Sequence, residues 1–288
     1  MTGWNDEGGL RWRALTPFGV EIDRDLSTPL GGQTAERFVA LFQEAGLIVA
    51  RGQTLAMEEQ VALMALLGPV SRRVDGVGYI SSEDNYTGAL AELTFHADYA
   101  FSTHPLDALS LHAVDVVDGT SSTRFASAGR AYTDLPVDIR ERLAAHAVEM
   151  ISPNYGVGMT MRTCDVREPD AMLREKRPSV LVNPRTGRSC LGVGEMHTAR
   201  LIGMDWEESR ALLGAVYEHL YAPDNIMEHV WHRGDIVIWD NITFQHARGS
   251  IEAVGRRVLQ RVTNGTKGLW DMYPGMFPGT DAFYALNQ

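Results

Sequence analysis

Short β-rich runs recur along the sequence and constrain its fold more than any other feature. The candidate strands are 18–22, 47–50, 108–116, 122–126, 179–183, 235–240 and 257–263. They do not follow the strict strand–helix alternation of a parallel sheet, and no glycine-rich phosphate-binding loop stands at a strand-to-helix junction. The pattern disfavours a doubly wound nucleotide-binding fold. It predicts an antiparallel barrel or sandwich with helices against one face.

Helical periodicity predicts helices in several of the segments between these strands. The expected helices are 33–45, 57–67, a segment from Asp134 or Pro136 through Ala147, and 206–221. Asp205 stands where it can cap the last of these. We interpret each helix as an amphipathic element with one buried face.

Composition excludes several classes of protein. The 288 residues carry a formal net charge of −11, which repels phosphate backbones and anionic lipid, so we expect no nucleic-acid or membrane partner. No apolar stretch is long enough to span a bilayer, and residues 1–23 lack the apolar core of a signal peptide. Only two cysteines occur, which fits a cytoplasmic location. No linker marks a boundary, so we expect one domain over 1–288 and leave a homo-oligomer open.

A first candidate for chemistry is the pair His96 and Asp98 in the run Leu-Thr-Phe-His-Ala-Asp-Tyr. If this run is a strand, residues two apart point to the same face, and the imidazole and carboxylate can bind one ion from the same side. A His-x-Asp pair is a weak signal by itself, because such short motifs also arise by chance.

Two further pieces lie near the C-terminus. The run Gly-Asp-Ile-Val-Ile-Trp-Asp-Asn precedes His246, and a predicted strand then carries Arg257 and Arg261. By the alternation of a strand, these two arginines share one face, and Arg256 lies on the other. If the first face looks inward, each buried guanidinium needs an anion from the protein or from a ligand.

Together these pieces resemble the taurine dioxygenase-like (TauD/TfdA) family of Fe(II)/2-oxoglutarate-dependent oxygenases. Asp98 and His246 are 148 positions apart, and Arg257 follows His246 by 11, as the family motif requires. The resemblance implies a mainly β fold with flanking helices and a double-stranded β-helix (jelly-roll) core. It also implies that His96, Asp98 and His246 bind Fe(II) as a facial triad that leaves positions open for 2-oxoglutarate and O₂.

The resemblance also implies roles for other side chains. It places Arg257 on the remote carboxylate of 2-oxoglutarate, which suits a bidentate guanidinium. In this family a threonine hydroxyl binds the same carboxylate, and its position matches Thr123. Arg124 departs from the family pattern, so Thr120, Ser121 and Ser122 remain alternatives for this role. Arg261 matches a position that holds an anionic substrate, with an ion pair to a protein carboxylate as the alternative. Arg72 and Tyr79 are the remaining substrate-binding candidates.

The activity implied is a dioxygenase that hydroxylates a C–H bond of a small or medium organic acid and releases succinate and CO₂. Desaturation or ring closure of a natural-product intermediate is an alternative with the same cofactors. A halogenase is disfavoured because Asp98 occupies the position where chloride would bind the iron. A metal-dependent hydrolase would use the same ligands, but it needs no distant dicarboxylate anchor such as Arg257. A non-catalytic jelly-roll binding protein is the last alternative.

Overall fold

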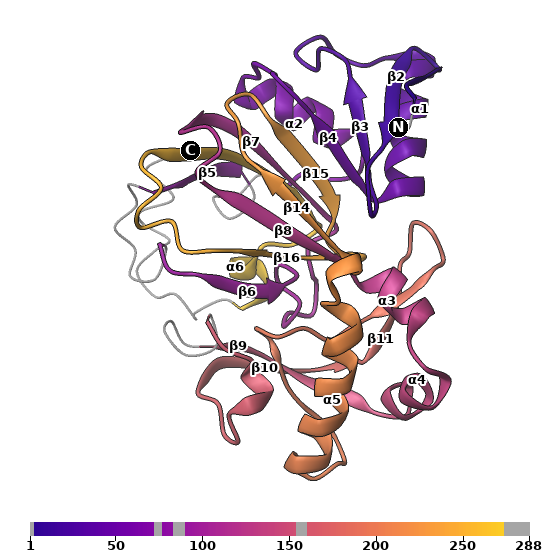
Figure 1. Cartoon of the computed structure of the whole chain (residues 1–288), viewed down its shortest axis with the longest axis vertical. Coiled ribbons are helices and arrows are strands. Elements are labelled where there is room, and N and C mark those ends of the chain that lie inside the picture. Colours follow the sequence, from indigo (N-terminus) through magenta and orange to yellow (C-terminus); the bar gives the residue numbers. More distant parts are fainter. Residues whose placement is uncertain (1–2, 72–76, 83–89, 154–159, 274–288) are drawn as a thin grey trace.

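The computed structural model describes residues 3–71, 77–82, 90–153 and 160–273, and its largest element is an eight-stranded sheet (Figure 1). In spatial order its strands are β1 (Asn5–Glu7), β2 (Leu10–Ala14), β3 (Val20–Asp23), β4 (Leu47–Ala50), β15 (Ile236–Asp240), β7 (Ala108–Val116), β17 (Arg257–Asn264) and β5 (Val77–Ser81). Neighbouring strands are antiparallel except β3 and β4, which are parallel. The sheet therefore has the antiparallel character that the sequence predicts.

A four-stranded sheet faces the central strands of the large sheet. Its strands, in order, are β14 (Ile226–Val230), β8 (Ser122–Ser127), β16 (Phe244–Arg248) and β6 (Leu93–His96). The apolar layer between the two sheets includes Phe125 and Trp231 from the small sheet side and Trp239 and Leu259 from the large sheet. Two facing antiparallel sheets around one apolar layer form the predicted jelly-roll core.

Helices cover the outer face of the large sheet. They are α1 (Gly32–Ala45) and α2 (Met57–Ala65), and they bury Phe38, Phe42 and Leu63 against the outer side chains of the sheet. β4 is buried on both faces, because Ile48 points to the helices while Val49 points to the small sheet. This explains why the run 47–50 is continuously apolar.

A further layer is inserted in the chain between β8 and β14 and lies below β6 and β16 in Figure 1. Its elements are α3 (Ala128–Asp134), α4 (Val137–Ala144), β9 (Ala147–Pro153), β10 (Ala171–Pro178), β11 (Val180–Val182), β12 (Ser189–Leu191), β13 (Thr198–Leu201) and α5 (Trp206–Leu220). Short 3₁₀ turns occur at Thr163–Asp165 and Pro223–Asn225, and α6 (Leu269–Met272) follows β17. The apolar core of this layer includes Phe95 and Phe101, which flank the His-x-Asp motif. The layer therefore packs directly beside that motif.

Most predicted elements are confirmed, and the end of one predicted helix is wrong. Strands 47–50 and 108–116 have the predicted bounds, and Asp205 caps α5 by accepting a hydrogen bond from the Glu208 amide. The helix predicted to run to Ala147 ends at Ala144 instead, and Ala147 begins β9. Strand β9 pairs with β10 on one side and β13 on the other, and this pairing overrides the helical periodicity. Among the described residues, no helix is long and apolar enough to cross a membrane.

Candidate metal and cosubstrate site

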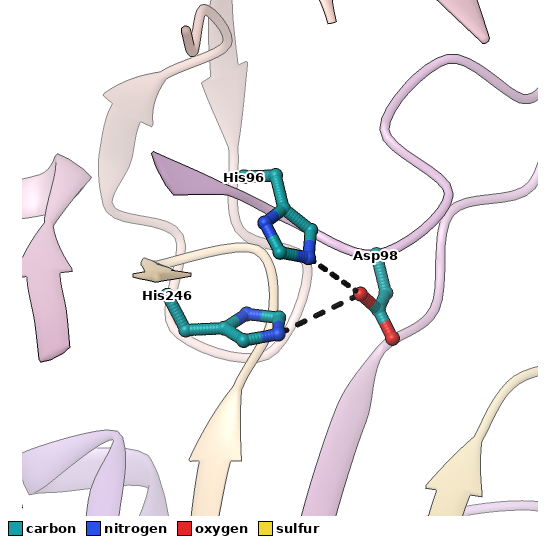
Figure 2. A group of neighbouring side chains, drawn as sticks. All are labelled: His96, Asp98 and His246. Carbon is teal, nitrogen blue, oxygen red and sulfur yellow. Dashed lines mark ion pairs between the residues drawn. The ribbon is translucent and has the colours of Figure 1, made fainter. Parts of the chain in front are cut away.

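The small sheet brings His96, Asp98 and His246 together (Figure 2). His96 ends β6 and pairs in register with His246 of β16, so the two imidazoles lie side by side on adjacent strands. The Oδ1 atom of Asp98 lies 3.3 Å from His96 Nε2 and 3.7 Å from His246 Nε2. The three candidate ligand atoms all lie within 4.8 Å of one another. This set of two imidazoles and one carboxylate fits a divalent ion of the non-haem iron type.

Asp98 reaches this site by a route that differs from the prediction. β6 ends at His96, and Asp98 lies in the following turn rather than on a strand face shared with His96. Asn241, at the end of β15, fixes that turn: the Asp98 amide donates to Asn241 Oδ1, and Asn241 Nδ2 donates to the Asp98 carbonyl, both at 2.9 Å. His96 is held separately, because its Nδ1 atom lies 2.8 Å from the Thr94 carbonyl oxygen. Such contacts orient a metal ligand before the ion binds.

Burial and neighbouring charges keep Asp98 and His246 in the protonation states that bind metal. Burial, reinforced by the neighbouring His96, lowers the pKa of His246 to about 3. Burial alone would raise the pKa of Asp98, but its hydrogen bond with His96 and the charge of Arg261 hold that pKa well below its usual value. A neutral imidazole and an ionised carboxylate are the forms in which these side chains coordinate a metal.

Arg257 is a buried cation without an anion from the described part of the chain. It begins β17 and is 2% exposed, and its Nε and Nη1 atoms have no hydrogen-bond partner in residues 3–71, 77–82, 90–153 and 160–273. It pairs with Val116 of β7, whose side chain lies in the layer between the sheets, so Arg257 points into that layer. Burial, with the nearby Arg248, lowers the pKa of Arg257 to about 10, so it stays charged at neutral pH. A buried guanidinium of this kind suits the carboxylate of a ligand.

The four hydroxyl candidates on the run 120–123 separate into two groups. Thr120 and Ser122 are exposed or bonded elsewhere, since Thr120 donates to the carbonyls of Val117 and Val254 and Ser122 donates to Glu228. Thr123 is 3% exposed and accepts a hydrogen bond of 3.0 Å from Trp231 Nε1. Ser121 is also buried, and its hydroxyl has no partner in the described part of the chain. Thr123 and Ser121 are therefore the two inward candidates.

The three substrate-binding candidates have different positions. Arg261 lies in β17 on the same face as Arg257, and its Nη2 atom lies 2.6 Å from Asp98 Oδ2. The structure therefore contains the ion pair to a protein carboxylate that was the alternative for Arg261. Tyr79 is 57% exposed and pairs with Gln260, whose side chain bonds to Gln60 of α2. The structure therefore places Tyr79 on the face of the large sheet away from the triad and does not bring it to the site. Arg72 lies outside the described residues.

The structure brings His197, which belongs to none of the sequence motifs, next to the site. Its side chain is 6% exposed, its ring centroid lies 6.0 Å from that of His96, and its Nδ1 atom lies 2.9 Å from the Ile151 carbonyl oxygen. A cavity of about 200 Å³ extends from these two histidines to the exposed Val182. Its lining is mostly apolar and includes Leu181, Leu191, Val193 and Ile242. No sequence motif marks His197, because its neighbours along the β9–β13 layer are distant in sequence.

Comparisons with known proteins agree with this geometry. Residues 11–263 match the model of the family described as "Taurine catabolism dioxygenase TauD, TfdA family". An alkylsulfatase of Acinetobacter baylyi is 29% identical, with 88% of this chain and 84% of the relative covered. A 2,4-dichlorophenoxyacetate dioxygenase of Cupriavidus pinatubonensis, dependent on α-ketoglutarate, is 27% identical, with 85% and 93% covered.

Solved structures show the same fold. A putative taurine dioxygenase from Burkholderia xenovorans superposes with a TM-score of 0.74 at 23% identity and covers 90% of this chain and 93% of its own. The structure of AAD-2 in complex with Mn(II) and N-oxalylglycine has the same TM-score and identity and covers 90% and 98%. Because the family model covers most of the sequence, the chain belongs to the TauD/TfdA family, and it is an Fe(II)- and 2-oxoglutarate-dependent dioxygenase.

Proposed function

We propose that this enzyme hydroxylates a C–H bond of a small or medium organic acid and converts 2-oxoglutarate to succinate and CO₂. The observation that carries the proposal is Arg257, a buried guanidinium whose Nε and Nη1 atoms have no partner among the described residues. It points into the same inter-sheet layer that His246 contacts through Phe125 and Trp239. A hydrolase using the same ligands has no need of this cation, whereas 2-oxoglutarate has a carboxylate for it.

In this proposal His96, Asp98 and His246 hold the Fe(II). The bound iron supplies the oxidising chemistry with O₂, and the protein supplies position and exclusion of water. His96 and His246 present Nε2 atoms from adjacent strands, and Asp98 presents Oδ1 from the turn that Asn241 holds. One carboxylate leaves the site a net positive charge when iron is bound, which favours an anionic cosubstrate.

Arg257 and Thr123 bind the remote carboxylate of 2-oxoglutarate in this proposal. The Thr123 hydroxyl accepts from Trp231, which leaves its own hydrogen for a carboxylate oxygen. Arg257 supplies two N–H donors, at Nε and Nη1, that have no acceptor in the described part of the chain. Ser121, which is buried and whose hydroxyl has no partner within the residues that the structure describes, is the alternative to Thr123.

The proposed substrate is an anion with a limited apolar body. Arg261 is the cation of β17 beside the triad, and the net charge of −11 provides no general attraction for an anion. The cavity beside His96 has room for one ring or a short chain, since a cavity of about 150 Å³ already accepts benzene. Relatives named for alkyl sulfates, sulfate esters and 2,4-dichlorophenoxyacetate suggest such compounds as candidates.

The test is a screen for succinate release with iron and ascorbate over alkyl sulfates, sulfonates and aryloxyalkanoic acids. Each acid is paired with an uncharged analogue of the same body. We expect succinate release to depend on an acid of the set and to fall strongly with its uncharged analogue. Mass spectrometry then identifies the reaction. Hydroxylation adds one oxygen atom or, on a carbon beside a heteroatom, gives an alcohol that breaks down to a carbonyl compound and the expelled sulfate, sulfite or phenol. Desaturation and ring closure instead remove two hydrogen atoms. Equal succinate release with the acid and its analogue would contradict an anionic substrate.

A further inference from the structure

We propose that Arg261 is a positioning residue for the metal ligand Asp98, in addition to any contact that it makes with a substrate. The proposal rests on the metal triad of the proposed function. It concerns the contact between a guanidinium of the large sheet and a carboxylate that belongs to the turn after β6.

The two carboxylate oxygens of Asp98 contact different groups. Oδ1 faces the imidazoles of His96 and His246, at 3.3 and 3.7 Å, while Oδ2 lies 2.6 Å from Arg261 Nη2. The side chains of Asp98 and Arg261 are 18% and 16% exposed, so water screens this ion pair less than a surface pair. The geometry points to a carboxylate that offers one oxygen to an ion because a cation holds the other.

Asp98 needs such a partner because its backbone is fixed but its side chain is not. Asn241 bonds to the amide and the carbonyl of Asp98, which fixes the turn and leaves the carboxylate free to rotate about its side-chain bonds. His96 and His246 contact the carboxylate at Oδ1, the oxygen that faces the ion site. A hydrogen bond from His96 Nε2 to this oxygen is lost when both atoms bind an ion, so the imidazoles do not hold the carboxylate once the ion is bound. In the described structure, Arg261 is the cation that contacts Asp98.

The backbone of Arg261 is fixed by strand pairing on both sides. It lies within β17, which pairs with β7 on one side and β5 on the other, and its partners across the two ladders are Leu111 and Gly78. The triad histidines belong to the other sheet, so the Arg261–Asp98 ion pair joins the two sheets at the metal site. Residues that orient a ligand in this way commonly contribute tenfold to a hundredfold to metal affinity.

A positive charge beside a cation site has a second, opposite effect. Arg261 repels a divalent ion, so a residue that acted by charge alone would weaken metal binding, and its removal would tighten it. A residue that only anchors the substrate would leave metal binding unchanged. The sign of the change in metal affinity therefore separates positioning from both other roles.

The experiment measures Mn²⁺ binding to the metal-free protein by calorimetry, without 2-oxoglutarate or substrate. We expect Arg261→Gln to raise the Kd by tenfold to a hundredfold and Arg261→Lys, which keeps the charge but loses the planar fork, to raise it less. The matched control is Arg256→Gln, because Arg256 directly precedes β17 and its side chain is exposed and forms an ion pair with Asp115. We expect this control to bind Mn²⁺ like the wild type, and circular dichroism checks that each variant is folded.

Unchanged or tighter Mn²⁺ binding by Arg261→Gln would overturn the proposal. If that variant is unfolded, Arg261→Lys decides in its place, and wild-type affinity of the folded Lys variant overturns it. The variant Asp98→Ala tests separately whether Asp98 binds the metal at all. If Asp98→Ala binds Mn²⁺ as well as the wild type, the assignment of Asp98 as a ligand is wrong, and the role of Arg261 falls with it.

Discussion

Two adjacent arginines have opposite environments. Arg256 is exposed and paired with Asp115, whereas Arg257 is buried and its Nε and Nη1 atoms lack a partner in the described part of the chain. A buried charge without a counterion costs stability, and a protein keeps one where a ligand supplies the missing anion. At the scale of single residues, this contrast is the clearest mark of a binding site in the structure.

We expect Arg257→Gln to raise the Kd for 2-oxoglutarate by about tenfold to a hundredfold, because a hydrogen bond to a charged group contributes about 1.5–3 kcal/mol. Calorimetric titration of the Mn²⁺-loaded protein measures this change. Arg256→Gln is the control and should bind 2-oxoglutarate like the wild type, since its side chain is 59% exposed. Equal losses in the two variants would show that Arg257 does not bind the cosubstrate.

Strand alternation alone predicted much of this residue-scale picture. It placed Arg257 and Arg261 on one face of β17, and the structure confirms that both lie on the face toward the small sheet. It could not predict that Asp98 leaves the strand and meets Arg261, because that contact joins residues 163 positions apart. Tyr79 was misplaced for the same reason, since its facing depends on its register with β17.

At the scale of elements, the end of β15 fixes the loop that carries Asp98. Asn241 is 1% exposed and bonds to the backbone of Asp98 twice and to the Leu106 carbonyl once. The sequence run before His246 contained Asn241, but its partners lie more than 130 positions away, so its role had no local signal.

We expect Asn241→Ala to weaken Mn²⁺ binding by about tenfold or more, because the turn that presents Asp98 loses its anchor. Calorimetry with Mn²⁺ measures the effect. Asn225→Ala is the matched control, since Asn225 is also buried and donates to two backbone carbonyls, those of Ser127 and Leu220, away from the metal site. Both variants should lose stability, and an equal loss of Mn²⁺ affinity in both would contradict a specific role for Asn241.

The contact of α2 with the large sheet contains a buried polar pair. Gln260 Nε2 donates to Gln60 Oε1 at 2.7 Å, and Gln60 Nε2 donates to Ser110 Oγ at 2.7 Å. We expect Gln60→Leu to lower the free energy of unfolding by about 1–3 kcal/mol, because it leaves the Gln260 amide buried and unpaired. Urea unfolding measures this change. The double variant with Gln260→Leu should lose less than the sum of the single variants, and simple additivity would contradict the coupling.

At the scale of the whole molecule, the two sheets and the inserted layer enclose a group of histidines that are neutral when folded. Burial lowers the pKa of both His197 and His246 to about 3, from an ordinary value of 6.5. Below pH 6.5 the unfolded chain binds protons that the folded chain does not, so stability falls as the pH falls from 6.5 towards 3. The lowered pKa of Asp98 acts in the same direction at lower pH.

We therefore expect the Tm of the metal-free protein to fall between pH 7 and pH 4. His197→Gln should reduce this dependence on pH, because it removes one of the two groups with a pKa of about 3. Scanning calorimetry over this range measures both quantities. A Tm that is independent of pH, or that rises on acidification, would show that these histidines accept protons in the folded protein.

The architecture of the molecule was more predictable than its interior contacts. Antiparallel strands, the jelly-roll core and the cap of α5 follow from local patterns in the sequence. The layer from α3 to α5 was predicted less well, because β9 is stabilised by strands on both sides that are distant along the chain. Its placement of His197 beside His96 is a property of the assembled layers, and no local pattern encodes it.

The central claim is that His96, Asp98 and His246 form one iron site. The most direct test is succinate formation from 2-oxoglutarate with added Fe(II) and an accepted substrate, for each alanine variant of the triad and for His219→Ala. His219 lies on α5, outside the triad, and serves as the control. We predict that each triad variant loses iron-dependent succinate formation while it keeps its fold by circular dichroism, and that His219→Ala retains it. Near wild-type succinate formation by folded Asp98→Ala would contradict the account.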